Sequence, residues 1–317
     1  MRNPPTDVLS HLKGNTHAAS GGRGCRDSGN AGRPAAGIFR GKGDFSARAV
    51  VWVVPPVVIG AVNLGPTSPR VLLHAAGFAA ALGAGLKVLH VAANITADTQ
   101  ATVAAECLRM APYQAMFEES DVLVRLGPAD ETIQDEVRQH HAALLVIGSS
   151  GHGHFARLLM GSTSDSLLQT TQTPILLVPP NDLDIINSVD GFKLTCGPVL
   201  VAIDLSEDSR PQLEAASRMA QLAGQGLLVM TVASGPVSDH DAAEQLRDRA
   251  HGLAPIKPTS LIVRRGNVAE EISRCAVAED SGLVVLGLRE PARGRPGVIA
   301  SAVLHTGRAF VLAVPAG

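Results

Sequence analysis

Aromatic side chains and cysteines are scarce in this chain of 317 residues. Seven Phe, one Tyr and one Trp make up only 3% of the sequence, whereas apolar residues as a whole make up 45%. We therefore expect a core built from Ala, Val, Leu and Ile, which are the usual filling of a parallel sheet covered by helices on both faces. The four cysteines are scattered singly and form no CxxC pair, which argues against a disulfide framework or a zinc site and fits a reducing compartment.

Long apolar runs and an excess of charge are absent as well. The longest apolar run, residues 49–62, is interrupted by Pro55 and Pro56 and is shorter than the roughly 20 residues that a membrane-spanning helix needs. No early apolar segment typical of a secretion signal precedes it. The formal net charge of −2 gives no reason to expect nucleic acid or an acidic membrane as a partner. We expect a cytoplasmic protein.

The first 48 residues differ in composition from the rest of the chain. They contain nine glycines, six arginines and two lysines against three aspartates, and they show no apolar periodicity. Such a segment buries too little apolar surface to offset the entropy lost on ordering. We predict a disordered basic tail over residues 1–48.

The remainder of the chain contains an internal repeat. The offset between matching positions changes only from 141 to 136 along five apolar segments, which chance rarely produces. The matched segments are VVIGAV (57–62) and VLVAI (199–203), LKVLHV (86–91) and LLVMTV (227–232), VLVRLG (122–127) and IVRRG (262–266), LLVIG (144–148) and LVVLG (283–287), and ILLVP (175–179) and VLAVP (311–315).

Helical patterns separate these apolar segments. Ser68 and Pro69 are suited to the N-cap and first position of one helix, and Gly83 and Gly224 are suited to helix ends. Strands that alternate with helices indicate right-handed parallel βαβ units. We predict two tandem α/β, Rossmann-like domains, each a five-stranded parallel doubly wound sheet, which together form a pseudo-dimer. The predicted ranges are 49–180 for the first domain, 181–197 for a linker and 198–317 for the second domain.

A glycine-rich loop follows the fourth apolar segment of the first half. Gly148 and Gly151 are followed after nine residues by Gly161 and Ser162, which gives the pattern G-x2-G-x9-G-S. Glycine lets the backbone approach a polyphosphate, and the N–H groups at the start of a helix favour an anion. The chain has neither a Walker A lysine in this loop nor GxGxxG after the first strand, so neither a P-loop nor a dinucleotide site is indicated.

This spacing, followed by TPILLVP, resembles the signature of ATP-binding universal stress proteins over residues 56–180 and more weakly over 198–315. The resemblance implies an adenine nucleotide alpha hydrolase-like fold that binds ATP, with or without Mg²⁺. It places ribose and phosphate contacts at the glycines and hydroxyls of the loop, and an adenine contact at Val91 of the pair His90-Val91. The residues predicted to bind the nucleotide are Asn63, Val91, Ile147, Gly148, Gly151, Gly161, Ser162 and Thr163. Asn63 departs from the family, which has an acidic residue there.

The second half departs from the pattern in the opposite way. Asp204 supplies the acid, but Glu290 stands where a glycine is wanted, and the loop from Gly287 to Gly297 is three residues shorter than its counterpart. A carboxylate beside a phosphate is repulsive, although the arginines of this loop leave a weak anion site open. We therefore expect one nucleotide, bound in the first half.

Three functions of different classes remain open. The first is a regulatory module of the stress response that binds an adenine nucleotide. The second is a scaffold without nucleotide, whose last strands pair with another copy in a homodimer. The third is a weak ATPase or nucleotidyl-transfer enzyme, for which we identify no set of base, metal ligands and lysine. His152 and His154 lack Cys or carboxylate partners, so we interpret them as solvent-facing and predict no metal site.

Overall fold

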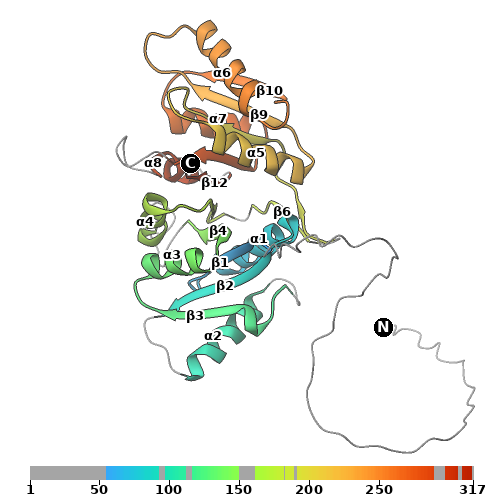
Figure 1. Cartoon of the computed structure of the whole chain (residues 1–317), viewed down its shortest axis with the longest axis vertical. Helices are drawn as coiled ribbons and strands as arrows, with labels where there is room; N and C mark the ends of the chain where they lie inside the picture. The colour runs from blue at the N-terminus through green and yellow to red at the C-terminus, as the bar shows by residue number, and fades with distance from the viewer. Residues whose placement is uncertain are drawn as a thin grey trace, which may run out of the picture. The chain divides into compact units, whose positions relative to one another are not determined.

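The computed structural model describes residues 55–92, 97–111, 116–149, 161–181, 183–188, 191–288, 297–305 and 309–315. The predicted disordered tail lies outside these residues, as do Gly151, His152, His154 and Glu290. The described part of the chain contains one sheet of ten strands, with helices on its two faces (Figure 1).

Each half contributes five strands and four α-helices in strict alternation. The first half contains β1 (Val57–Ala61), α1 (Ser68–Leu82), β2 (Gly85–Ala92), α2 (Ala97–Met110), a short 3₁₀ helix (Glu119–Asp121), β3 (Val122–Leu126), α3 (Ala129–Gln139), β4 (Ala142–Gly148), α4 (Ser162–Thr170) and β5 (Ile175–Val178). The second half contains β8 (Val199–Ala202), α5 (Arg210–Ala223), β9 (Leu227–Val232), α6 (Asp239–Leu253), β10 (Ser260–Arg264), α7 (Val268–Ala278), β11 (Leu283–Gly287), α8 (Val298–His305) and β12 (Phe310–Val314).

The strand order is the same in the two halves. It runs β3-β2-β1-β4-β5 in the first half and β10-β9-β8-β11-β12 in the second, and every pair within a half is parallel. In each half the order reverses beside the first strand, which creates a switch point between β1 and β4 and between β8 and β11. The α/β class and the ten predicted strands are therefore confirmed.

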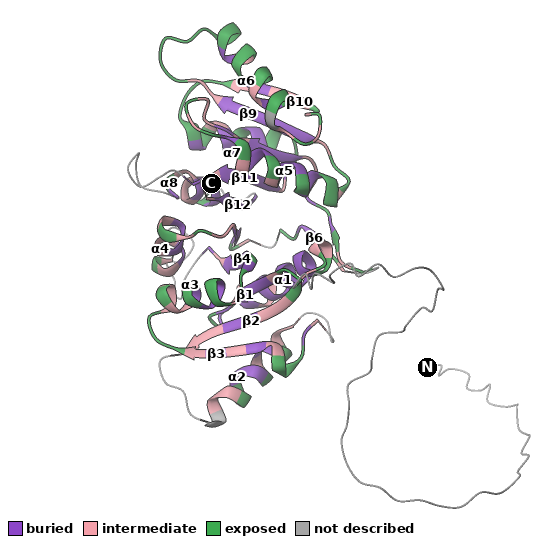
Figure 2. Cartoon of the chain, in the orientation of Figure 1, coloured by how far each residue is buried: buried purple, intermediate pink, exposed green. Residues whose placement is uncertain are grey.

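The central strands are buried because helices cover both faces of the sheet. All residues of β5 and β12 are buried, whereas the outer strands β3 and β10 keep exposed positions (Figure 2). This burial explains why these strands have continuous apolar sequences instead of alternating ones. The buried side chains fall into two large clusters, each of which contains residues of both halves.

Two helix ends lie where the sequence predicts them, and one helix start differs. Gly83 and Gly224 end α1 and α5 in the left-handed conformation, with φ of 62° and 61°. At the start of α1 the N-cap is Thr67, and Ser68 is already helical. The predicted N-cap is therefore wrong by one residue, and the Ser68 hydroxyl donates a hydrogen bond to Asn63 Oδ1 instead.

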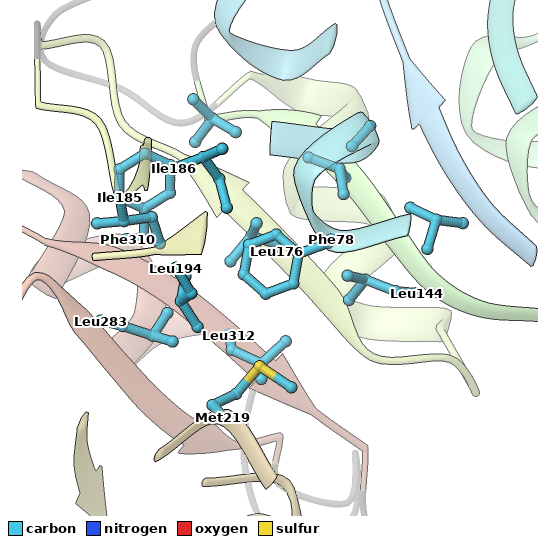
Figure 3. Close-up of a cluster of buried hydrophobic side chains, with 14 of the residues drawn as sticks. Phe78, Leu144, Leu176, Ile185, Ile186, Leu194, Met219, Leu283, Phe310 and Leu312 are labelled. Atoms are coloured by element: carbon cyan, nitrogen blue, oxygen red, sulfur yellow. The ribbon is translucent and has the colours of Figure 1, made fainter. Parts of the chain in front are cut away.

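The segment between the halves is packed, although its sequence looks like a polar linker. It forms a small antiparallel pair, β6 (Ile186–Asn187) and β7 (Lys193–Leu194). Ile186 and Leu194 are buried in the cluster that also contains Phe78 of α1 and Met219 of α5 (Figure 3). A Cβ atom at Gly77 would lie 2.7 Å from Ile186 Cγ2, so the glycine on α1 makes room for this segment.

The two halves join through their last strands. β12 pairs with β5 in antiparallel orientation, with Leu312 opposite Leu176, and each of these strands also pairs with a strand of its own half. We predicted that the last strands pair with a second copy of the chain, and this prediction is wrong about the partner. Their free edges pair with each other inside one chain, which leaves no edge for another copy at this position.

Candidate functional site

A cavity of about 380 Å³ lies at the switch point of the first half. It is bounded by the carboxyl ends of β1 and β4 and by the first turns of α1 and α4, where doubly wound sheets bind their ligands. The structure brings seven of the eight predicted site residues to its wall, namely Asn63, Val91, Ile147, Gly148, Gly161, Ser162 and Thr163. The eighth, Gly151, lies outside the described residues.

The wall beside β1 is held in place by Asn63. Its Oδ1 accepts hydrogen bonds from the Gly65 backbone N–H at 3.0 Å and from the Ser68 hydroxyl at 3.3 Å. These bonds fix the turn that leads from β1 into α1. Thr67, Ser68 and Val71 consequently face the cavity from the first turn of this helix.

The opposite wall is the start of α4. Gly161 is its N-cap and provides no side-chain cap, so the first N–H groups of the helix are not satisfied by a capping side chain. Ser162, Thr163 and Ser164 line the cavity from the same turn. The Ser164 hydroxyl donates to Gly148 O at 2.9 Å, and Gly161 N–H donates to Ser149 O at 3.1 Å. These two bonds tie the helix start to the end of β4.

The third side of the cavity is more apolar. Leu89 and Val91 on β2, Ile133 on α3 and Leu167 on α4 contribute to it. His90 Nδ1 lies 3.0 Å from Val62 O, which ties the end of β2 to the end of β1. The site thus combines a hydroxyl-rich helix start with a surface suited to a flat, weakly polar ring.

Charged side chains are missing from the described wall of the cavity, whose lining residues include no Asp, Glu, Lys or Arg. Within the described ranges there is also no group of three His, Cys, Asp or Glu residues that could hold a metal ion. Outside the lining residues, the Ser166 hydroxyl of α4 donates to Asp130 Oδ2 at 2.6 Å and lowers the pKa of this carboxyl. This bond connects α4 to α3.

Sequence reasoning missed several residues of the wall. Ser68 was predicted only as a helix N-cap, and Thr67, Val71, Ala129 and Ile133 were not predicted to line the site. Contacts of this kind can be predicted wherever a helix begins directly after a strand that borders the switch point, because the first turn of that helix faces the ligand site. Which side chains face inward depends on the rotation of each helix, which the sequence pattern leaves open.

The matching cavity of the second half is much smaller, at about 90 Å³. Gln212, which corresponds to Val71 at the offset of 141, is buried there, and a Cβ atom at Gly287 would lie only 1.9 Å from its Nε2. Val268 replaces Ala129, and the start of α8 has Val298 and Ile299 where α4 has Ser162 and Thr163. The cavity of the second half is therefore smaller than that of the first, and its described lining residues include no Ser or Thr.

Comparison with known proteins gives a family for the part of the chain that contains the large cavity. Residues 57–179 match the universal stress protein family. A curated universal stress protein of Mycolicibacterium smegmatis is 30% identical over 139 residues, which cover 39% of this chain and 46% of the relative. This chain thus spans about half the length of that relative.

Solved structures extend the similarity to both halves. A universal stress protein from Archaeoglobus fulgidus covers 82% of this chain and 98% of its own, with 18% identity and a TM-score of 0.61. At this identity the match shows the fold alone. Another universal stress protein structure from the same organism, in complex with dAMP, covers 38% of this chain and 96% of its own, with 22% identity and a TM-score of 0.29. No helix in the described part of the chain is long and apolar enough to cross a membrane.

Proposed function

We propose that the first half binds an adenine nucleotide and that the chain works as a regulatory module of the stress response. The observation that carries the proposal is the cavity of about 380 Å³ at the switch point of the first half, which is lined by seven of the residues predicted from the resemblance to universal stress proteins. The match of residues 57–179 to that family agrees with it. The two halves would then correspond to the two protomers of a dimer, fused in one chain.

The chemistry of the walls suits a nucleotide. The N–H groups and hydroxyls at the start of α4 favour phosphate oxygens, because hydrogen bonds to a charged acceptor are strong and the helix dipole favours an anion. Val91, Ile133 and Leu167 offer apolar contact to a base. A volume of about 380 Å³ lies in the lower part of the range of roughly 300–1,000 Å³ that is usual for small-molecule sites.

In this cavity, Mg²⁺ would be held by the phosphates of the nucleotide and not by side chains of the protein. No carboxylate occurs among the described lining residues, and the Asn63 Oδ1 atom already accepts two hydrogen bonds. Mg²⁺ is commonly held by one or two carboxylates together with substrate phosphates. We propose that the nucleotide binds here with only a weak dependence on Mg²⁺.

The change Gly161→Val tests the site. The backbone at Gly161 has φ −62° and ψ 145°, a conformation that any residue adopts, so valine introduces no backbone strain. Its branched side chain would stand where phosphate approaches the start of α4. We expect nucleotide binding to be lost with little change in the melting temperature.

Isothermal titration calorimetry with ATP, ADP and AMP, each with and without Mg²⁺, provides the measurement. The matched control is Gly85→Val, because a Cβ atom at this exposed first residue of β2 would meet no atom within 4 Å. Unchanged affinity of the Gly161 variant would contradict the assignment of this loop. If none of the three nucleotides bound to the unmodified chain, the proposed function itself would be wrong.

A further inference from the structure

The connecting segment is attached to α1 by one arginine. Arg70 Nε donates to Asp184 Oδ1 at 3.0 Å, while its two terminal nitrogens donate to the backbone oxygens of Pro179 and Leu183. Its side chain is only 15% exposed. A guanidinium shielded from water that bridges three acceptors holds its partners in one geometry, which an exposed ion pair does not do.

His74, one turn further along α1, continues this attachment. Its ring is fully buried, with Nδ1 2.7 Å from Arg70 O and Nε2 3.3 Å from the backbone N–H of Ile185. Both bonds are satisfied together by one neutral tautomer, in which Nδ1–H donates to Arg70 O and Nε2 accepts from Ile185. The histidine thus connects the helix to a residue of the connecting segment that is itself buried.

The third member of this cluster belongs to the second half. The ring of Phe310, the first residue of β12, lies 4.4 Å from the His74 ring, and the Arg70 guanidinium lies 5.5 Å from its centroid. Phe310 is fully buried and is labelled among the packed side chains of Figure 3. We call Arg70, His74, Asp184 and Phe310 the α1 anchor. It joins α1, the connecting segment and β12.

The helix held by this anchor is also a wall of the large cavity. Thr67, Ser68 and Val71 line the cavity, and Arg70 lies among them in the first turn of α1. The second half has no equivalent of the anchor, because the offset of 141 places Pro211 and Ala215 at the positions of Arg70 and His74. The helix that carries Arg70 and His74 is therefore the one that lines the large cavity.

We propose that the α1 anchor couples nucleotide binding in the first half to the connecting segment and to β12 of the second half, with Arg70 as the positioning residue. The proposal rests on the proposed function. A ligand that contacts the first turn of α1 favours the arrangement in which this turn is fixed, and the anchor fixes the same turn through Arg70. Coupling is reciprocal, so the ligand must in return stabilise Asp184, Ile185 and Phe310 in their present positions.

Hydrogen exchange measured by mass spectrometry on the full chain tests the coupling. Peptides over residues 183–187 and 310–314 are followed with and without the adenine nucleotide that binds most tightly in calorimetry. In the unmodified chain we expect the nucleotide to slow exchange in both peptides, although neither forms part of the cavity wall. In Arg70→Gln we expect both peptides to exchange faster without nucleotide, the response to nucleotide to disappear, and affinity to fall roughly tenfold, within the range usual for coupled sites.

Two further variants complete the experiment. Arg109→Gln removes an exposed ion pair with Glu106 on α2 and should behave like the unmodified chain. Asp184→Asn weakens the anchor from its exposed side and should change exchange and affinity in the same direction by a smaller amount, which covers the case that Arg70→Gln does not fold. The coupling would be overturned if nucleotide bound without changing exchange in either peptide, or if the folded Arg70 and Asp184 variants kept their affinity. Neither outcome would contradict the proposed function. Absence of binding to the unmodified chain would overturn the proposed function.

Discussion

Single side chains decide how much room each half leaves at its switch point. Val71 and Gln212 occupy matching positions on α1 and α5, yet the cavities beside them have volumes of about 380 and 90 Å³. Ser162 of α4 is likewise matched by Val298 of α8, which is 53% exposed. A few substitutions of this kind change the chemistry of a site without changing the strands and helices around it.

Asn63 provides the first test at this scale. In Asn63→Asp both acceptor bonds to Gly65 and Ser68 can persist, because a carboxylate also accepts them. Asp204 shows that the second half accommodates the acid, since its Oδ1 accepts from the backbone and hydroxyl of Ser206. We expect ATP to bind about tenfold more tightly with Mg²⁺ and to gain little without it, because the added charge holds the cation. Calorimetry in the two buffers measures the difference, and an equal gain in both would contradict the reasoning.

Gln212 provides a test of stability. Its Oε1 is buried and has no hydrogen-bond partner within the described part of the chain, which costs roughly 1–3 kcal/mol. Gln212→Met keeps the length of the side chain and removes the amide, so we expect the free energy of unfolding to rise by about 1 kcal/mol. Urea unfolding measures this free energy, provided that its dependence on urea concentration is the same in both proteins. A loss of stability would indicate that the amide has a partner after all.

At the scale of elements, the connecting segment and α1 depend on each other. Ten of the fifteen residues of α1 are buried, including positions on the side that faces away from the sheet, because β6 and β7 cover that side. The fully buried His74 belongs to this contact. Burial lowers its pKa to about 4, an effect that the nearby Arg70 reinforces and the nearby Asp184 and the hydrogen bond to Arg70 O oppose.

The lowered pKa of His74 predicts a pH dependence of stability. In the unfolded chain the imidazole titrates near 6.5, so between about pH 6.5 and 4 the unfolded state binds more protons than the folded state. The free energy of unfolding should therefore fall as the pH is lowered through this window, by up to about 3 kcal/mol. Above about pH 6.5, the titration of His74 should have no effect on the free energy of unfolding.

The control for this prediction is His74→Gln, which retains an acceptor for the Ile185 N–H and has no proton to gain. Melting temperatures of both proteins between pH 4 and pH 8 measure the effect. The variant should lose less stability than the unmodified chain as the pH falls. Parallel curves for the two proteins would show that His74 is not buried in its neutral form.

At the scale of the whole molecule, the two halves share one topology and differ in the size and lining of the cavity at the switch point. β5 and β12 join them into a continuous sheet, while among the described residues the large cavity and the hydroxyls at the start of a helix occur together in the first half. The second half instead contributes Phe310 to the anchor beside that cavity. Phe310 thus packs against the helix that lines the large cavity.

This asymmetry predicts one nucleotide per chain. Calorimetry should give a stoichiometry of one for the unmodified chain, since Val298 and Ile299 at the start of α8 replace the hydroxyl residues Ser162 and Thr163 at the start of α4. Val71→Gln gives the first half the side chain that lies in the small cavity of the second half, and it should remove the one site. Two sites per chain, or one site that survives both Val71→Gln and Gly161→Val, would show that the second half is the one that binds.

The strands and the positions of Gly148 and Gly161 at the end of a strand and the start of a helix were predictable because their signals are local. Continuous apolar runs predict buried parallel strands, and the spacing of Gly148 and Gly161 places glycine where a strand ends and a helix begins. The packing of the connecting segment was not predictable in the same way. Ile186 and Leu194 are isolated apolar residues in a polar stretch, and their burial depends on the gap between α1 and α5 above β5 and β12.

The sequence by itself therefore determined the α/β class, the internal repeat, the parallel βαβ units of each half and seven of the residues that line the cavity. The tertiary structure decided that β5 pairs with β12 inside the chain, that Gln212 fills the second cavity and that Arg70 and His74 join α1 to the second half. The physical reason is the distance along the chain between the partners. The apolar pattern of a strand and the spacing of glycines involve residues that are close together in the sequence. Contacts such as that between His74 and Phe310 depend instead on how complete layers pack against each other.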